Sequence, residues 1–178
     1  MKSALVATLF LNLILAYALG DQNANVRQLI ADRDHMLAQR LAVLEVEQFI
    51  ERANPKLDKA TRRGYAEILV DASNEYHIPH KLLAAVAYTE SRFRHTATGD
   101  GGRSHGIFQL QGLWIKEIPF VNSERDLYEP AINIRAGAWV LRYMADRCGF
   151  HNMLSCYNAG ENNPDAARHY EAKVMSEL

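Results

Sequence analysis

The segment from Lys81 to Glu90 is apolar at helical spacing and ends on a carboxylate, and this feature constrains the fold most. Its apolar positions fall on one stripe: Leu82, Leu83, Val86 and Ala87. Such a stripe predicts a helix that is buried along one face. Glu90 then lies near the helix C-terminus, where burial and the negative end of the helix dipole both disfavour a charged carboxylate. We therefore expect its pKa to be raised toward the range of a general acid, the alternative being a solvated or capping glutamate.

A glycine-rich segment follows this helix. Its glycines allow a positive φ at four positions: Gly99, Gly101, Gly102 and Gly106. The alternation from Ser104 to Leu110 is typical of a short strand that packs through alternate residues. We expect a small β-hairpin beside the helix. Gln109 either faces a cleft there and binds a substrate, or is a strand-end amide satisfied by the backbone.

Three segments in this order resemble the catalytic core of the lytic transglycosylase and goose-type lysozyme superfamily. They are Glu90-Ser91, the Gly106 to Gln109 segment, in which Phe108 replaces the usual methionine, and Tyr157-Asn158-Ala159-Gly160. Residues 133–141 and the segment Tyr170 to Val174 are similar to a later helix and the closing tyrosine segment of the family. The resemblance covers roughly the C-terminal two-thirds of the chain. It implies a mainly α, lysozyme-like α+β fold, a helical domain with a small β-hairpin beside the catalytic helix.

The resemblance implies an enzyme that cleaves the glycan strands of peptidoglycan, with Glu90 as the only acid and base. In lytic transglycosylases one glutamate suffices, because the substrate's N-acetyl group assists and its own C6 hydroxyl attacks, which leaves 1,6-anhydromuramyl ends. The residues expected at the substrate are Ser91, Asp100, Ser104, Gly106, Gln109, Tyr157, Asn158 and Tyr170. No cofactor is implied. A metal is not expected either, since His77 and His80 have no third ligand at suitable spacing.

Two alternatives stay open. The first is a goose-type lysozyme, which hydrolyses the same bond with water and whose turn resembles Gly99-Asp100-x-Gly102-x-x-x-Gly106, with Asp100 as a second carboxylate. Gln111, which stands where an acid often follows the motif glutamine, weakens this alternative. The second is a non-catalytic protein that binds peptidoglycan within a secretion, conjugation or phage entry machine. Four motif residues occurring together disfavour it: Glu90, Gln109, Tyr157 and Asn158.

Residues 1–20 differ in composition from the rest of the chain. Lys2 precedes an apolar run from Ala4 to Leu19, and Ala18-Leu19-Gly20 offers small residues at a signal-peptidase site. The segment predicts a periplasmic or secreted protein, with residues 1–20 as a cleaved signal peptide or as an uncleaved anchor in the inner membrane. The absence of a cysteine near the cleavage point argues against a lipoprotein.

Residues 21–54 predict an amphipathic helical extension before a domain at residues 55–178. Its apolar stripe consists of Val26, Ile30, Leu37, Leu41 and Leu44. Wrapping around the domain is the default expectation, with a coiled-coil stalk or contact with a partner as alternatives. Asn54-Pro55 marks a break, and a further helix over residues 58–76 leads to the Glu90 helix.

Charge and cysteine content narrow the partners and the compartment. A chain of 178 residues with net charge -1 fits one globular domain and offers no basic field for nucleic acid. Basic residues nevertheless gather where the cleft mouth is expected, either to steer the carboxylates of peptidoglycan or as a solvated face: Arg92, Arg94, His95, Arg103 and His105. Cys148 and Cys156 form either a disulfide in an oxidising periplasm or two buried thiols.

Overall fold

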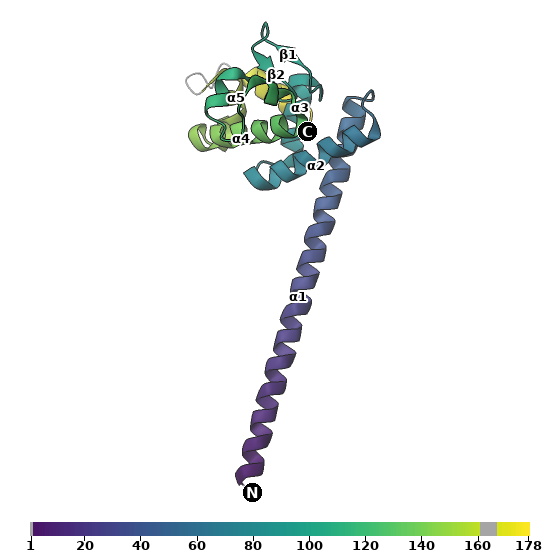
Figure 1. Cartoon of the computed structure of the whole chain (residues 1–178), viewed down its shortest axis with the longest axis vertical. Coiled ribbons are helices and arrows are strands. Elements are labelled where there is room, and N and C mark those ends of the chain that lie inside the picture. Colours follow the sequence, from purple (N-terminus) through teal and green to yellow (C-terminus); the bar gives the residue numbers. More distant parts are fainter. Residues whose placement is uncertain (1, 161–166) are drawn as a thin grey trace. The chain divides into compact units, whose positions relative to one another are not determined.

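The computed structural model describes residues 2–160 and 167–178, except for the side chains of residues 2–13, 15–19, 21 and 22 (Figure 1). The chain divides into two units, Met1–Leu41 and Ala42–Leu178, and helix α1 (Lys2–Ala53) contributes to both. Most side chains of the expected export segment, residues 1–20, therefore lie outside what the structure describes. Within the described residues, no helix has the length and apolar character that crossing a membrane requires.

The second unit consists of helices with one small sheet. Its α-helices after α1 are α2 (Lys59–Tyr76), α3 (His80–Ser91), α4 (Pro130–Cys148), α5 (Met153–Ala159) and α6 (Arg168–Met175). Three 3-10 helices connect them: η1 (Gly112–Lys116), η2 (Glu124–Tyr128) and η3 (Phe150–Asn152). Helix α4 packs against both α2 and α5, and α6 packs against α3. This arrangement confirms the prediction of a mainly α, lysozyme-like domain with a small sheet.

The end of α1 belongs to the core of this second unit. Val43, Val46 and Ile50 are buried there, whereas apolar residues earlier in α1, such as Leu37 and Leu41, are exposed. Helix α1 stops at Ala53, immediately before the Asn54-Pro55 break, because a proline disfavours helix at the residue before it. The last turns of α1 therefore help to build the folded unit.

Local sequence signals set the ends of α2 and α3. Asp58 caps α2, since its carboxylate accepts a hydrogen bond of 3.0 Å from the backbone N–H of Thr61. His77 ends that helix in the left-handed region at φ 54°. Helix α3 starts directly after Pro79 and contains Glu90 as its penultimate residue, which confirms the predicted helix.

The sheet has three antiparallel strands of two residues each: β1 (Thr98–Gly99), β2 (Ser104–His105) and β3 (Leu110–Gln111). Thr98 pairs with His105, and His105 pairs with Leu110. The single strand predicted from Ser104 to Leu110 is wrong over residues 106–109, which form a turn. Ile107 and Phe108 are both fully buried, and two consecutive residues cannot point to the same face of a strand.

Candidate active site

A cleft of about 580 Å³ opens in the second unit beside the end of α3. Residues from α3, the sheet region, η1, α4 and α5 line it: Glu90, Asp100, Ser104, Gln109, Leu110, Gln111, Leu113, Trp114, Met144, Cys156, Tyr157, Asn158, Ala159 and Gly160. Glu90 and Asp100 are the acidic side chains among these described residues. The structure thus brings together residues that lie far apart in the sequence and that were expected at the substrate.

Glu90 occupies the wall of this cleft as a half-buried carboxyl group. Burial is the main cause that raises its pKa above the ordinary value, as expected from its position at the end of a buried helix. A hydrogen bond from Tyr170 and the charge of Lys173 act in the opposite direction, and the charge of Asp100 adds to the rise. A carboxyl group with a raised pKa keeps its proton closer to neutral pH, as a general acid must.

Tyr170, on α6, holds Glu90 directly. Its hydroxyl donates a hydrogen bond of 2.6 Å to Glu90 Oε1, and its ring stacks on that of Tyr157 with centroids 6.4 Å apart. The Tyr157 hydroxyl donates instead to the backbone carbonyl of Phe108, at 2.6 Å. Burial raises the pKa of both phenols, so both remain hydrogen-bond donors at working pH. Tyr170 therefore orients the carboxyl group, while Tyr157 holds the turn opposite it.

Asp100 and Ser104 also line the cleft and form a hydrogen-bonded pair. Ser104 Oγ donates to Asp100 Oδ2 at 2.6 Å, and Arg103 Nε donates to the backbone carbonyl of Asp100 at 3.0 Å. Asp100 is exposed and adopts φ 50°, a left-handed conformation that aspartate tolerates better than most residues. The carboxylate is thus placed in the same cleft as Glu90 but is solvated.

Gln109 lines the cleft, yet the backbone occupies its amide nitrogen. Nε2 donates to the carbonyls of Ala97 at 3.1 Å and Gly106 at 2.8 Å, so both of its hydrogens are used. The carbonyl oxygen Oε1 is the part of the side chain that could accept a bond from a ligand. Gln109 thus ties the turn together and borders the cleft, and its binding of a substrate stays a prediction.

Ser91 and Gly106 support the turn that borders the cleft. The Ser91 hydroxyl is buried and donates to the carbonyl of Ile107 at 2.8 Å, which joins the end of α3 to the turn. Gly106 has φ 76°, and a Cβ there would collide with the carbonyl of Leu127 and the amide of Asn133. Neither residue lines the cleft, so the structure places both as supports for it.

Asn133, at the start of α4, is the residue whose role the sequence left unassigned. Its fully buried amide accepts from Phe108 N–H at 2.7 Å and donates to the carbonyls of His105 at 3.0 Å and Leu127 at 2.7 Å. Three hydrogen bonds satisfy this amide and fix the turn on α4. An asparagine among apolar residues near a helix start was the available signal.

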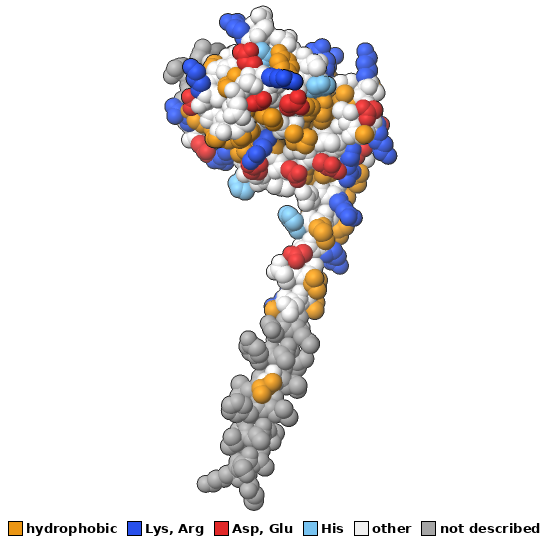
Figure 2. Space-filling view, viewed as in Figure 1, with side chains coloured by type: hydrophobic (Ala, Val, Ile, Leu, Met, Phe, Trp, Pro, Cys, Tyr) orange, Lys and Arg blue, Asp and Glu red, His pale blue; other side chains and the backbone are white. Residues whose placement is uncertain are grey.

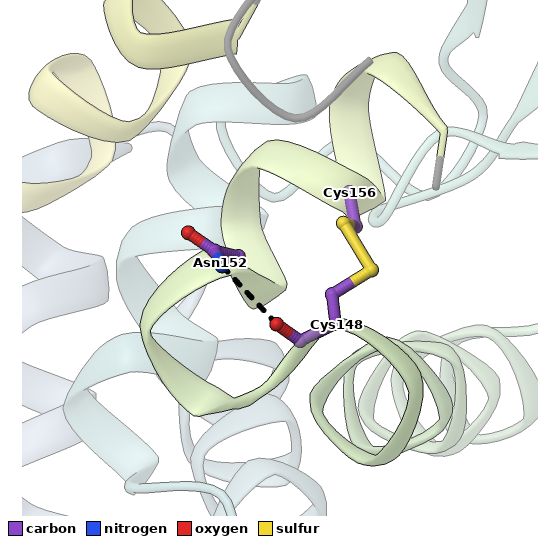
Figure 3. Close-up of a disulfide and its surroundings, with 3 residues drawn as sticks. All are labelled: Cys148, Asn152 and Cys156. Carbon is purple, nitrogen blue, oxygen red and sulfur yellow. Dashed lines mark hydrogen bonds between the residues drawn. A yellow bond between two sulfur atoms is a disulfide. The ribbon is translucent and has the colours of Figure 1, made fainter. Parts of the chain in front are cut away.

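The disulfide between Cys148 and Cys156 ties α4 to α5 at the cleft (Figure 3). Asn152 Nδ2 donates to the Cys148 carbonyl at 3.2 Å within the same short connection. Cys156 lines the cleft and directly precedes Tyr157 and Asn158, of which Asn158 is exposed. The cross-link therefore fixes the start of the segment that carries these two side chains.

Apolar side chains that the sequence did not single out complete the cleft. Leu113 and Trp114 come from η1 and Met144 comes from α4. Trp114 packs edge-on against Tyr143, with ring centroids 5.6 Å apart. A half-buried tryptophan supported in this way offers a flat apolar surface in the wall of the cleft.

None of the five basic residues expected at the cleft mouth lines the cleft. Arg92, Arg94 and Arg103 are exposed, and Figure 2 shows charged side chains of both signs over the visible face of the second unit. His105 is instead 4% exposed and bonds Tyr128 Oη through Nδ1 at 2.7 Å, so its expected place at the mouth is wrong. Its position in β2 directs the side chain inward, where it contacts Tyr128 on η2. Within the described part of the chain, no three His, Cys, Asp or Glu side chains are grouped to hold a metal ion.

Comparison with known proteins adds one finding. The family model described as the transglycosylase SLT domain matches residues 67–177. This region begins within α2 and contains Glu90, the sheet, the disulfide and Tyr170. No curated protein matches the chain.

Proposed function

The chain belongs to the transglycosylase SLT family, whose members cleave peptidoglycan, and from this premise we propose that it is a lytic transglycosylase with Glu90 as its only acid and base. The bond cleaved is the β-1,4 bond between N-acetylmuramic acid and N-acetylglucosamine, and the products carry 1,6-anhydromuramyl ends. The observation that carries the proposal is the half-buried Glu90 carboxyl, held by Tyr170 in the wall of the cleft.

In the first step, Glu90 transfers its proton to the glycosidic oxygen as the bond to the muramyl C1 breaks. The carbonyl oxygen of the sugar's own N-acetyl group forms a bond to C1, so a cyclic oxazolinium stores the positive charge. The raised pKa of Glu90 keeps the proton available, and Tyr170 stabilises the carboxylate that remains. The leaving chain departs as a neutral alcohol.

In the second step, the Glu90 carboxylate takes the proton of the muramyl C6 hydroxyl. The C6 oxygen attacks C1, the bond from the N-acetyl oxygen to C1 breaks, and the 1,6-anhydro ring closes. Glu90 is protonated again, so the cycle balances without a further reactant. Asp100 has no role in bond making in this scheme and supports the turn through Ser104.

Hydrolysis is the second candidate, because Asp100 lines the same cleft as Glu90. A positioned carboxylate can deliver an attacking water to C1 in place of the C6 hydroxyl. Two facts favour the lyase: Asp100 is exposed, and Gln111 stands where an acid often follows Gln109 in hydrolases of this type. A non-catalytic role in binding peptidoglycan is the third candidate. It is disfavoured because it does not explain the raised pKa of Glu90.

Mass spectrometry of the products from purified glycan strands distinguishes these candidates. We expect anhydro products, one water lighter than hydrolysis products, and at least a thousandfold loss of activity in Glu90→Gln with the fold retained. Asp100→Asn should lower the rate only a few-fold. Hydrated ends with a loss of about a hundredfold in Asp100→Asn would assign a hydrolase. Unchanged cleavage by Glu90→Gln would disprove the assignment of the acid.

A peptidoglycan substrate also requires export, and we propose that residues 1–20 direct it to the periplasm, as a cleaved signal or as a retained anchor. The apolar run from Ala4 to Leu19 after Lys2 supports this proposal. The mass of the N-terminal peptide of the native protein distinguishes the two forms. Protein found only in the cytosol would contradict export.

A further inference from the structure

A second hollow adjoins the cleft at Glu90. It has a volume of about 470 Å³, and the end of α3 and the α1–α2 connection form its walls: Ala53, Asn54, Pro55, Lys56, Thr89, Glu90, Ser91, Arg92 and Arg94. Among the described residues, Glu90 alone lines both the cleft and this hollow. A ligand in the hollow therefore lies next to Glu90, the proposed acid.

The hollow is strongly cationic. Lys56, Arg92 and Arg94 are exposed in its wall, and none of the three is in an ion pair with another described residue. Glu90 is the one acid in the wall, and it is neutral while it carries the proton for the first step. Three positive charges around one protonated acid create a field that attracts an anion.

The walls are held in place by hydrogen bonds across the hollow. Asn54 Nδ2 donates to the backbone carbonyl of Arg92 at 2.9 Å, which links the α1–α2 connection to the end of α3. Arg94 Nε donates to the carbonyl of Ser91 at 3.0 Å, so its remaining guanidinium donors stay available. Lys56 lies outside the region matched by the family model, so one wall is a feature of this chain's own N-terminal part.

We propose that this hollow binds a carboxylate carried by the muramyl residue that reacts at Glu90, an inference that rests on the proposed function. The C1 atom of that sugar must reach Glu90, and a lactyl group is attached to the same ring at C3. The lactyl group either ends in a free carboxylate or continues into a peptide that carries carboxylates. Arginine and lysine bind such groups by charge-assisted hydrogen bonds. The site thus selects strands that carry this substituent.

Equilibrium binding to the Glu90→Gln protein tests the proposal without turnover. Three probes are compared: glycan strands with stem peptides, strands stripped of peptide by an amidase, and a neutral oligomer of N-acetylglucosamine. We expect Lys56→Gln combined with Arg94→Gln to weaken binding of a carboxylate-bearing probe at least tenfold, as loss of charge-assisted bonds does. Binding of the neutral oligomer should change less than twofold.

The probes also identify the source of the carboxylate. A loss restricted to stripped strands assigns the free lactyl carboxylate, and a loss restricted to peptide-bearing strands assigns a carboxylate of the stem peptide. An equal loss with both shows that the hollow accepts a carboxylate from either source. Arg92→Asn, a residue type that tolerates the φ of 54° at this position, provides an independent third variant. Arg125→Gln is the control for Arg92→Asn, because it also removes one positive charge, and Arg125 is exposed on η2 and lines neither the cleft nor the hollow.

If the Lys56→Gln and Arg94→Gln pair weakened binding of all three probes equally, or did not weaken binding of any probe, the inference would be overturned. Circular dichroism of each variant excludes a loss of fold as the cause. The proposed function fails separately: a wild-type protein that binds carboxylate-bearing strands selectively but does not cleave them retains the binding site and loses the enzyme assignment. Conversely, a protein that cleaves the strands but shows no carboxylate-dependent change in binding would support the enzyme assignment and reject the proposed binding site.

Discussion

At the scale of residues, the contact between Tyr170 and Glu90 adjusts the acidity of the carboxyl group. The Tyr170 hydroxyl donates to Glu90 Oε1 at 2.6 Å and so stabilises the charged form, against the larger effect of burial. Tyr170→Phe removes this stabilisation and should raise the pKa of Glu90 further. Because the first step needs protonated Glu90, activity falls as pH rises through that pKa, and the basic limb of the kcat/KM profile should move to higher pH.

The same substitution should lower kcat at neutral pH about tenfold, since the carboxylate left after proton transfer loses its donor. Tyr128→Phe is the matched control, because Tyr128 is also a half-buried tyrosine whose hydroxyl is hydrogen-bonded, but its partners are His105 and Thr98 instead of Glu90. Its basic limb should not move. A basic limb that shifts to lower pH in Tyr170→Phe, or that does not shift, would show that the hydrogen bond does not act on Glu90.

At the scale of elements, the packing of α4 under the turn depends on Gly137. A Cβ at this position would collide with the ring of Phe108, whose carbonyl holds Tyr157. Gly137→Ala should therefore lower the free energy of unfolding by about 1–3 kcal/mol, as overpacking of a core does. Gly64→Ala in α2 has open space around the new Cβ and should raise it by about 0.5–1 kcal/mol, because alanine is the better helix former.

Urea denaturation of both glycine variants measures the two free energies on the same scale. Opposite signs would support the close contact between α4 and the turn. A stabilising effect of Gly137→Ala comparable to that of Gly64→Ala would contradict it, because the space that the structure fills with Phe108 would then be free.

The elements also show which features the sequence could predict. Helix α3 and the position of Glu90 followed from a local apolar stripe, because helical spacing is recorded within a few residues of the chain. The turn at Gly106 to Gln109 did not, because its conformation depends on Asn133 and Leu127, which are distant in sequence. The burial of His105 could not be predicted either, because it depends on the contact with Tyr128, which is distant in sequence. Tertiary partners decided both cases.

At the scale of the whole molecule, the boundary of the folded unit lies inside α1. The sequence placed the domain at residues 55–178, since Asn54-Pro55 is the visible break, whereas the compact unit starts at Ala42. The apolar residues before and after Ala42 have similar helical spacing, so the pattern alone does not reveal which of them are buried. Residues 42–53 contribute Val43, Val46 and Ile50 to the core.

Two shortened chains test this boundary. A chain of residues 42–178 keeps these three buried side chains, so its melting temperature and its lytic activity should equal those of the full chain. A chain of residues 55–178 loses them, and at about 1.5–3 kcal/mol for each buried aliphatic side chain its free energy of unfolding should fall by roughly 5 kcal/mol. That is a large share of the stability of an ordinary domain, so much of this chain should be unfolded at 37 °C.

The shorter chain also loses Asn54, which bonds the Arg92 carbonyl across the cationic hollow. Even where it stays folded, at low temperature, it should therefore bind carboxylate-bearing strands more weakly than the 42–178 chain does. The variant Asn54→Ala in the 42–178 chain separates this effect from the loss of core, since it removes the hydrogen bond and leaves Val43, Val46 and Ile50 in place. Equal stability of the two shortened chains, measured by urea denaturation, would place the last turns of α1 outside the cooperative unit.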